Sequence, residues 1–284
     1  MYFCTAADSN HYAVLLNLIG SIFKHNENEL QKIAVFNLGL TPDQISQLKL
    51  IDKVEVHEVE NVHPLVTTSL HCNNGRWIKG LFSWKAVVIK QALDMFPYVL
   101  YLDSGTTILN PLNGLFKHIQ QNKYFFTDCG HSIKWMTTKY IINKLKLNTP
   151  EKEWILNDDT LGIDAGFLGI TREMKTKFIE PLYELSKEIR NFIDDGTCPE
   201  GLGTGRHDQT LFSIIARDLK LTVLNHDREP EQCILVYDGT TEPLHITHSG
   251  DKVKPSTVIY RSRRSITQET YNQNVQFIKI KQEA

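Results

Sequence analysis

The segment YVLYLDSGTTIL at residues 98–109 constrains the fold of this chain more than any other. Its first five residues are apolar, β-branched or aromatic and follow a proline, which is typical of a buried strand. Asp103, Ser104 and Gly105 come directly after that strand. In open α/β sheets, ligands bind outside the carboxyl ends of the strands. Asp103 is therefore expected at a ligand site, where a carboxylate accepts from ribose hydroxyls or holds a divalent cation that bridges to phosphate.

Strand-like and helix-like patterns alternate along the first 60 residues. Strands are predicted at residues 1–8, 32–39 and 53–59, and helices at 12–25 and 41–50. The first helix carries its apolar residues on one face, and Thr41-Pro42 gives the second an N-cap followed by proline. This β-α-β-α-β order predicts an α/β fold with a mostly parallel central sheet flanked by helices.

The rest of the chain continues this pattern less regularly. Residues 61–82 are polar and are predicted to form a loop, after which Ser83 caps a helix. Further strands are expected at 98–102, 124–130, 165–170, 221–225 and 243–249, and further helices at 83–96, 173–193 and 207–219. The glycine-rich segment 196–205 is predicted to be a loop, and the polar tail from Ser256 is expected to wrap the surface.

Composition and motifs argue against several function classes. A formal charge of −2 gives no reason to expect a nucleic-acid partner. No run approaches the ~18 apolar residues of a membrane span, and the N-terminus resembles no signal segment. A cytoplasmic protein, or an excised domain, is therefore expected. The five cysteines form no CxxC pair, so reduced thiols rather than a zinc site are expected. No P-loop motif is present.

Four separated segments carry residues that suit a binding site. The first strand ends in AADSN followed by Tyr12, where polar groups can read a nucleobase and an aromatic ring can stack on it. Asp103 is the second piece, and Asp208 at a helix start is the third. The fourth is HITHSGDKVKP, in which His248 is a possible metal ligand and Lys254 a possible phosphate partner. Each piece alone is also compatible with a turn, a helix cap or a structural histidine.

Together these segments resemble the retaining glycosyltransferases of the GT-A fold, of the glycogenin and bacterial lipopolysaccharide galactosyltransferase type. The opening turn of that family corresponds to AADSNHY, its YLDxDxxV strand to YLDSGTTIL, and its FNAG turn to Asp164-Ala165-Gly166. Its acidic-Gln pair corresponds to Asp208-Gln209, and its HFxGxxKPW motif to HITHSGDKVKP. The resemblance implies a GT-A domain over residues 1–255, with residues 256–284 as a C-terminal tail that packs on the same domain.

The resemblance also implies roles for individual residues. A UDP-sugar donor would be bound by Ala6, Ala7, Asp8, Asn10, Tyr12, Lys85, Asp103, Ser104 and Lys254. Asp103 and His248 would coordinate Mn²⁺ or Mg²⁺ on the donor diphosphate. Asp164, Asp208 and Gln209 would surround the donor sugar as catalytic residues.

Two departures from the family pattern bear on these roles. Gly105 stands where the family has its second aspartate, and a glycine has no side chain to bind a metal. A metal-independent site is therefore the alternative, in which Lys85, Arg76 or Lys254 neutralises the leaving group. Asp164 stands where the family has an asparagine.

The predicted activity is hexosyl transfer from a nucleotide-diphosphate sugar, with UDP favoured, to a hydroxyl of a glycan or glycoconjugate, with retention of configuration. Residues that could contact the acceptor are Trp135, Trp154, His131 and Asp128. One alternative is a catalytically weak nucleotide- or glycan-binding protein, which Gly105 favours. A sugar nucleotidyltransferase is the other, although AADSNHY lacks the glycine-rich basic loop that such enzymes carry after the first strand.

Overall fold

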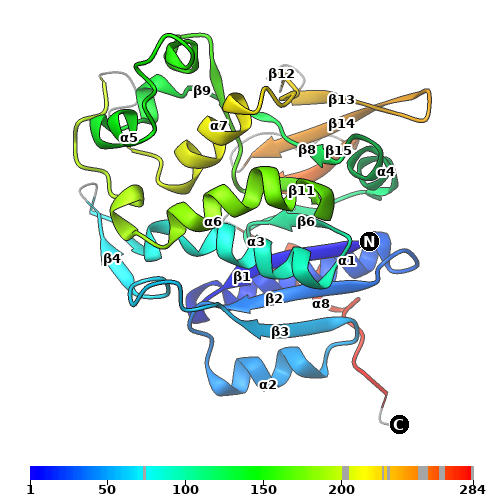
Figure 1. The fold of residues 1–284 in the computed structure, drawn as a ribbon. Helices are drawn as coiled ribbons and strands as arrows, with labels where there is room; N and C mark the ends of the chain where they lie inside the picture. The colour runs from blue at the N-terminus through cyan, green and yellow to red at the C-terminus, as the bar shows by residue number, and fades with distance from the viewer. Residues whose placement is uncertain are drawn as a thin grey trace.

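A computed structural model describes residues 1–72, 75–199, 205–225, 227–228, 231–248, 255–261 and 266–282. Its centre is a six-stranded sheet (Figure 1). In spatial order the strands are β3 (Val54–Glu58), β2 (Lys32–Asn37), β1 (Tyr2–Ala7), β6 (Tyr98–Leu102), β11 (Phe167–Thr171) and β8 (Tyr124–Phe125). β1 pairs in parallel with β2 and β6, and β2 with β3, whereas β11 is antiparallel to β6 and β8. The mostly parallel α/β sheet is confirmed.

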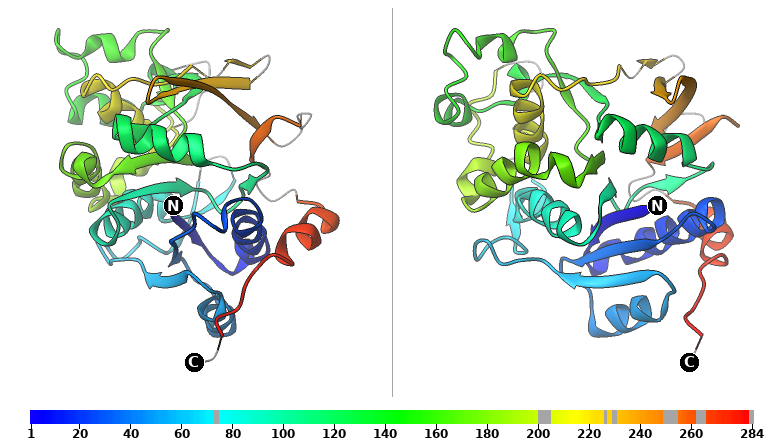
Figure 2. Two further views of the ribbon diagram at one scale, coloured as in Figure 1. Left: turned by 90° about the vertical axis from the view of Figure 1, so that its right-hand side faces the viewer. Right: turned by 45° about the vertical axis from the view of Figure 1, so that its right-hand side comes forward.

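Helices cover both faces of this sheet. In chain order, the helices of the described segments are α1 (Tyr12–Asn26), α2 (Pro42–Leu50), α3 (Trp84–Met95), α4 (Asn113–Asn122), α5 (Lys139–Lys144), α6 (Glu180–Ser186), α7 (Asp208–Asp218) and α8 (Gln268–Val275). α3 and α6 lie together on one face, and α1 and α8 lie together on the other (Figures 1 and 2). The start of α2 has the expected cap, because the Thr41 side chain accepts from Gln44 N and the Gln44 side chain accepts from Thr41 N.

Side chains of β6 alternate between the two faces of the sheet. Val99 and Tyr101 join the core on the α3 side, whereas Leu100 and Leu102 join the core on the α1 side. This alternation is the ordinary consequence of strand geometry. Continued by one residue, it directs Asp103 to the same side as Tyr101, towards α3.

A second, five-stranded sheet packs beside the first. Its strands, in order, are β12 (Asp227–Arg228), β13 (Glu231–Tyr237), β14 (Thr240–His248), β15 (Thr257–Arg261) and β7 (Thr107–Ile108). Because β7 follows β6 closely in the chain, it carries the backbone from the first sheet into the second. Two small ribbons complete the strands, β4 (Ser69–His71) with β5 (Trp77–Lys79) and β9 (Asp128–Ser132) with β10 (Leu161–Ile163).

Several elements differ from the sequence-based expectation. The predicted loop at 61–82 contains the β4–β5 ribbon, and residues 221–225 form only a single bridge, from Leu224 to Thr127. Residues 173–193 are not one α-helix, because residues 175–179 form a π-helical turn and Glu188 is extended, which separates α6 from the next helical turn. Ser83 does not cap α3 with its side chain, since its Oγ lies 3.1 Å from Nε2 of His63.

Single turns of helix fill the segments between these elements. They are η1 (Ser9–His11), η2 (Gly80–Phe82), η3 (Lys134–Met136), η4 (Glu153–Leu156), η5 (Arg172–Met174), the π-helical η6 (Lys175–Ile179) and η7 (Ile189–Phe192). Within the predicted glycine-rich loop, residues 200–204 lie outside the described residues.

The C-terminal tail is more ordered than expected. Residues 257–261 form β15, which lies between β14 and β7, and α8 packs against α1. A Cβ on Gly20 of α1 would overlap the Asn274 backbone, so the glycine permits the close approach of the two helices. Asn274 Nδ2 also donates to Asn17 Oδ1 at 2.8 Å in the buried interface.

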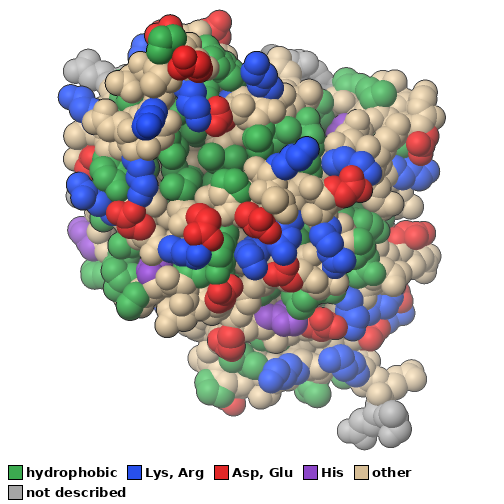
Figure 3. All heavy atoms as spheres, in the orientation of Figure 1, with side chains coloured by type: hydrophobic (Ala, Val, Ile, Leu, Met, Phe, Trp, Pro, Cys, Tyr) green, Lys and Arg blue, Asp and Glu red, His purple; other side chains and the backbone are tan. Residues whose placement is uncertain are grey.

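Neither sign of charge dominates the molecular face that carries α3 and α6. Acidic and basic side chains are interspersed over the face that carries α3 and α6 (Figure 3), and they include the Lys90–Asp94 ion pair at 3.1 Å. All five cysteines lie in described segments, and none of them forms a disulfide there. Of the helices in the described segments, none has both the length and the apolar character that a membrane crossing requires.

Candidate active site

Three aspartates from separate segments meet beyond the carboxyl end of β6. Asp103 follows β6, Asp164 follows β10, and Asp208 is the first residue of α7. Lys85 forms ion pairs with Asp103 and Asp208, and Arg261 forms ion pairs with Asp103 and Asp164. We call Lys85, Asp103, Asp164, Asp208 and Arg261 the charged cluster. Four of its members were expected at the site from the sequence, and the structure brings these four together.

Asp103 has cationic or hydroxyl partners on both of its carboxylate oxygens. Oδ1 accepts from the Tyr101 hydroxyl at 2.9 Å and lies 3.3 Å from Lys85 Nζ. Oδ2 accepts from Nη2 of Arg261 at 3.2 Å. The Asp103 side chain is nevertheless 39% exposed, so it remains open to a ligand. Burial and the neighbouring carboxylate raise the pKa of Tyr101 well above its ordinary value, which keeps its hydroxyl protonated as a donor.

Lys85 is the least exposed member of the charged cluster, with only 5% of its side chain exposed. Its Nζ donates to the Ala165 carbonyl at 3.0 Å and lies 2.8 Å from Asp208 Oδ2. Burial lowers the pKa of Lys85, but Asp103 and Asp208 outweigh burial, so that the pKa is raised and the side chain remains an ammonium. Because this ammonium is enclosed by protein atoms, Lys85 holds two carboxylates in place rather than facing a ligand.

Asp208 and Gln209 occupy the first turn of α7. Asp208 is buried, and burial raises its pKa although the ammonium of Lys85 opposes the shift. Gln209 Nε2 donates to the Ile163 carbonyl at 3.0 Å. Ile163 is the last residue of β10 and directly precedes Asp164, so this bond ties the start of α7 to the Asp164 turn.

Arg261 enters the cluster from the second sheet. Its Nη1 contacts Asp164 Oδ2, and only 15% of its side chain is exposed. Burial lowers the pKa of Arg261, but Asp164 and then Asp103 raise it above its ordinary value. The guanidinium lies against Gly166, where a Cβ would overlap both the guanidinium and the Asp103 carboxylate. A glycine at this position is therefore what permits the contact.

The opening turn at residues 6–10 lies at the same edge of the sheet as Asp103. β1 and β6 are parallel neighbours, with Cys4 beside Tyr101, and so their carboxyl ends meet. Ala6 and Ala7 are buried, and Asn10 is exposed. The turn therefore presents Asn10 and backbone groups to solvent next to the cluster, which is a suitable place for a nucleobase.

Two side chains of this segment are engaged within the protein. Asp8 Oδ1 accepts from His11 N at 3.1 Å and lies 2.6 Å from His11 Nδ1. Burial opposes ionisation of Asp8, but these contacts lower its pKa, which keeps it a carboxylate. The Tyr12 hydroxyl donates to Gln47 Oε1 at 2.7 Å. Asp8 thus caps the η1 turn, and a contact of Asp8 or Tyr12 with a nucleotide stays a prediction.

A divalent cation would need oxygen ligands that other cations have not already taken. In the charged cluster, both oxygens of Asp103 contact Lys85 or Arg261, and Arg261 also takes Asp164 Oδ2. In the segments that the structure describes, no three His, Cys, Asp or Glu side chains are grouped to hold a metal. The described side chains as arranged therefore do not fit a divalent cation.

The fourth predicted segment is only partly described. The His248 backbone pairs with Arg261, so β14 ends beside the residue that contacts Asp103. The side chain of His248 and all of Lys254 lie outside the described residues. Metal coordination by Asp103 and His248, and a phosphate contact of Lys254, stay predictions. Ser104 is buried directly after Asp103, and its role in donor binding also stays a prediction.

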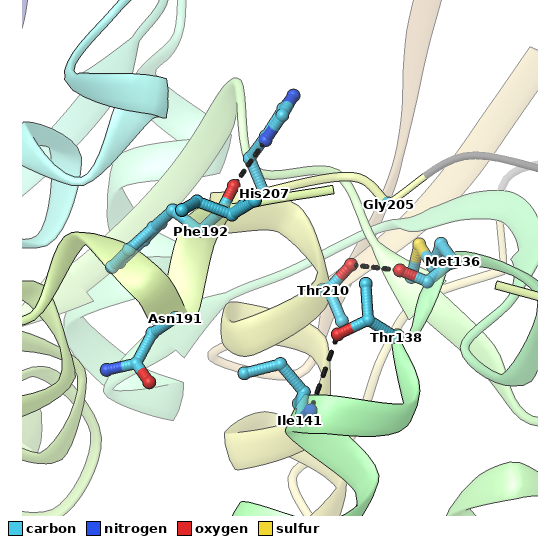
Figure 4. Close-up of a pocket in the computed structure, with 9 residues that line it drawn as sticks. Met136, Thr138, Ile141, Asn191, Phe192, Gly205, His207 and Thr210 are labelled. Atoms are coloured by element: carbon cyan, nitrogen blue, oxygen red, sulfur yellow. Dashed lines mark hydrogen bonds between the residues drawn. The ribbon is translucent and has the colours of Figure 1, made fainter. Parts of the chain in front are cut away.

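A small pocket lies next to the start of α7, between α5, η3 and η7 (Figure 4). At its edge Thr210 Oγ1 donates to the Met136 carbonyl at 2.7 Å, and His207 Nδ1 lies 2.6 Å from the Phe192 carbonyl. His207 has a φ of 48°, which is uncommon for a residue with a Cβ. These bonds hold that conformation and so fix the direction from which Asp208 enters the cluster.

Two of the predicted acceptor contacts, Asp128 and His131, belong to β9, where Asp128 pairs with Ile163, the residue before Asp164. Trp154 Nε1 donates to the Glu151 carbonyl at 3.1 Å, and Gly130 N donates to Asp128 Oδ1 at 2.8 Å. Arg76 is exposed next to β5. Acceptor roles for Trp135, Trp154, His131 and Asp128 therefore stay predictions.

Arg261 and Tyr101 are the two contributors that the sequence analysis did not assign. A signal for each was present. Residues 257–261 read TVIYR, a β-branched and aromatic run that indicates a strand rather than a surface tail. Tyr101 and Asp103 are two positions apart, and the period of a strand places such side chains on one face.

The comparisons with known proteins identify the fold. No family model and no curated protein sequence matches the chain. An active-site mutant of the galactosyltransferase LgtC matches with a TM-score of 0.53 and 12% identity, over 100% of this chain and 98% of that one. Core-mannan synthase A (CmsA/Ktr4) from Aspergillus fumigatus, in a Mn/GDP form, matches with a TM-score of 0.52 and 10% identity, over 76% of this chain and 68% of that one.

A bifunctional glycosyltransferase, WbbM in its apo form, also matches, with a TM-score of 0.47 and 13% identity over 76% of this chain. The chain spans 37% of the length of that protein. The similarity to LgtC and CmsA/Ktr4, together with the mixed and mostly parallel sheet, shows that this chain has the GT-A fold of these glycosyltransferases.

Proposed function

We propose that this protein transfers a hexosyl group from a nucleotide-diphosphate sugar, with a UDP-sugar favoured, to a hydroxyl of a glycan or glycoconjugate. The observation that carries the proposal is the charged cluster beyond the carboxyl end of β6, next to the opening turn of β1. Ligands of open α/β sheets bind at this edge. CmsA/Ktr4, which has the same fold, was solved with GDP, and this supports a nucleoside diphosphate as the ligand.

In this proposal the base and ribose lie at the 6–10 turn and the diphosphate lies over Asp103 and Arg261. The donor sugar then lies near Asp164 and Gln209, which the Gln209–Ile163 hydrogen bond holds together. Asp208 is buried against Lys85, so we assign it the role of positioning Lys85 and, through it, Asp103.

Transfer breaks the bond between C1 of the sugar and the diphosphate oxygen, and forms a bond from C1 to the acceptor oxygen. We propose that the acceptor attacks from the side on which the diphosphate leaves, so that the configuration is retained and the acceptor proton passes to the departing diphosphate. Negative charge grows on that diphosphate in the transition state. Preorganised donors aimed at it stabilise the transition state more than the ground state.

A donor panel tests this function. The purified chain is incubated with UDP-, GDP- and dTDP-sugars, and release of the free nucleoside diphosphate is measured together with the melting temperature. We expect turnover, and a raised melting temperature, with at least one UDP-sugar, because a ligand that binds only the native state stabilises it.

Other outcomes of the panel would replace the proposal. Binding without any turnover would favour a nucleotide- or glycan-binding protein. In a separate incubation with a nucleoside triphosphate and a sugar phosphate, formation of a sugar nucleotide would favour a nucleotidyltransferase. If no nucleotide sugar is turned over or raises the melting temperature, the proposed function is wrong.

A further inference from the structure

We propose that the guanidinium of Arg261, and not a divalent cation, balances the charge of the donor diphosphate, so that this site binds nucleoside diphosphates without a metal. The inference rests on the proposed function and concerns the same site. It starts from the position of Arg261, whose two terminal nitrogens contact the two aspartates nearest the sheet edge, Asp103 and Asp164.

The Arg261 side chain is held in place from three directions. Asp103 and Asp164 each take one terminal nitrogen, and Gly166 leaves the space that the guanidinium fills. The backbone of Arg261 is fixed by β14, where it pairs with His248. A side chain restrained in this way loses little further conformational freedom when a ligand binds, which favours tight binding.

The guanidinium has donors to spare for a phosphate. It carries five N–H groups, and the contacts with Asp103 and Asp164 are made by one terminal nitrogen each. Its planar fork matches the oxygens of a phosphate, and such charge-assisted pairs are among the stronger hydrogen bonds in proteins. The Arg261 side chain is 15% exposed, so it is not completely enclosed by the protein.

The same arrangement disfavours a divalent cation. A metal bound at Asp103 would have to displace the Arg261 contact on Oδ2 and would lie near the ammonium of Lys85, which is 3.3 Å from Oδ1. The cluster already pairs its carboxylates with two cations, and a metal would compete with them for the same oxygens. The other carboxylates of the cluster are also engaged, because Arg261 contacts Asp164 Oδ2 and Lys85 lies 2.8 Å from Asp208 Oδ2.

Calorimetric titration with UDP, and with GDP and dTDP if UDP does not bind, tests the inference. Wild-type protein is titrated in EDTA and, separately, in excess MnCl₂. The variants are Arg261→Ala, Arg261→Lys and the matched control Arg172→Ala. Arg172 is exposed, and its Nε donates to the Leu93 carbonyl. Arg172 follows Thr171, which pairs with Tyr98 at the amino end of β6, so Arg172 lies at the opposite end of that strand from Asp103. Circular dichroism confirms that each variant is folded.

We expect the wild-type dissociation constant to differ by less than about threefold between the two buffers. In EDTA, Arg261→Ala should weaken UDP binding by roughly 10- to 100-fold, the loss of a charge-assisted hydrogen bond. Arg261→Lys should weaken UDP binding less than Arg261→Ala, because the positive charge stays. It should still weaken binding, because the planar guanidinium is lost. Arg172→Ala should bind UDP like the wild type.

The outcomes separate this inference from the proposed function. Wild-type binding that occurs only with Mn²⁺ would overturn the inference and leave the proposed function standing, even if no variant folded. An Arg261→Ala variant that binds UDP in EDTA as tightly as the wild type would also overturn it. If UDP, GDP and dTDP fail to bind in both buffers, the proposed function and this inference are both wrong.

Discussion

Arg261 and Asp103 are 158 positions apart in the chain, yet Nη2 of the arginine lies 3.2 Å from Oδ2 of the aspartate. Asp103 leaves the first sheet at the end of β6, and Arg261 ends β15 in the second sheet. β7, which begins at Thr107, pairs with β15 and brings Tyr260 opposite Thr107. The contact between the two charges therefore follows from the strand pairing that joins the sheets.

Replacement of Asp103 by asparagine should abolish most of the transfer activity. The carboxylate holds Arg261 and Lys85, and both cations lose a partner in Asp103→Asn. We expect turnover of the best donor to fall by at least roughly 100-fold, which is typical when preorganised electrostatic stabilisation is removed. Steady-state release of the nucleoside diphosphate measures the effect.

The matched control for this variant is Asp94→Asn. Asp94 is a partly exposed aspartate near the other end of α3, where it pairs with Lys90 and Lys175. Its replacement should leave turnover within about twofold of the wild type, as expected for a surface ion pair. Near-normal turnover by Asp103→Asn would remove Asp103 from the site.

The local patterns of the sequence were sufficient to predict the opening part of the fold, up to the end of β3 at Glu58. Alternating strands and an amphipathic helix with caps fix β1 to β3, α1 and α2, because each pattern is satisfied within a short window. The β4–β5 ribbon escaped prediction because its strands have three residues each and few apolar side chains. The run TVIYR carried a local signal for β15, but its pairing with β14 and β7 is long-range, and no local pattern specifies such a partner.

Replacement of Lys85 by methionine should destabilise the protein, and more so at higher pH. The change leaves Asp208 buried without its cation, which costs about 3–5 kcal/mol near neutral pH. Burial already holds the folded pKa of Asp208 above its ordinary value of 3.8, and loss of Lys85 raises it further. An acid with a raised folded pKa binds a proton on folding, so its contribution to stability falls as the pH rises from about 3.8.

The free energy of unfolding, measured with urea at about pH 4.5 and about pH 7.5, checks this expectation. The free energy of unfolding of Lys85→Met should fall further below that of the wild type at the higher pH than at the lower one. The control is Lys90→Met on the same helix, whose ion pair with Asp94 lies at the surface and should contribute at most about 1 kcal/mol. If the difference in free energy of unfolding between the two proteins becomes smaller with rising pH, the pairing of Lys85 with Asp208 is contradicted.

Gly166→Ala should act through Arg261. The added Cβ would overlap the guanidinium and the Asp103 carboxylate, so we expect Arg261 to leave the cluster and UDP binding in EDTA to weaken by roughly tenfold. In a protein that already carries Arg261→Ala, Gly166→Ala should weaken UDP binding less. A double-mutant cycle should therefore give a coupling free energy of about 0.5–3 kcal/mol. Strictly additive effects would show that Gly166 does not position Arg261.

Tyr101→Phe should have a mild effect. The hydroxyl donates to Asp103 Oδ1, which Lys85 also contacts, and Asp103 is exposed enough for water to replace the lost donor. We expect the free energy of unfolding to fall by about 1 kcal/mol, and turnover to fall by less than about tenfold. Tyr98→Phe, at the amino end of the same strand, is the control. A fall of more than about 100-fold would place the Tyr101 hydroxyl on the substrate instead.

Individual site residues could be predicted where they stand at the end of a recognisable strand or at the start of a recognisable helix. Asp103 and Asp208 stand at such boundaries, and Lys85 lies in the first turn of a predicted helix. The pairing of these charges was not predictable, because it depends on which strands are neighbours in space. Arg261 shows this most clearly, since its partner aspartates lie 97 and 158 positions away in the chain.

A crystal structure of the protein with UDP, grown in EDTA, tests the central claim most directly. We expect the diphosphate over Asp103 with a phosphate oxygen in hydrogen-bond distance of the Arg261 guanidinium, and the uracil at the 6–10 turn. Nucleotide bound away from the carboxyl end of β6, or Arg261 turned out of the cluster in the complex, would contradict the account.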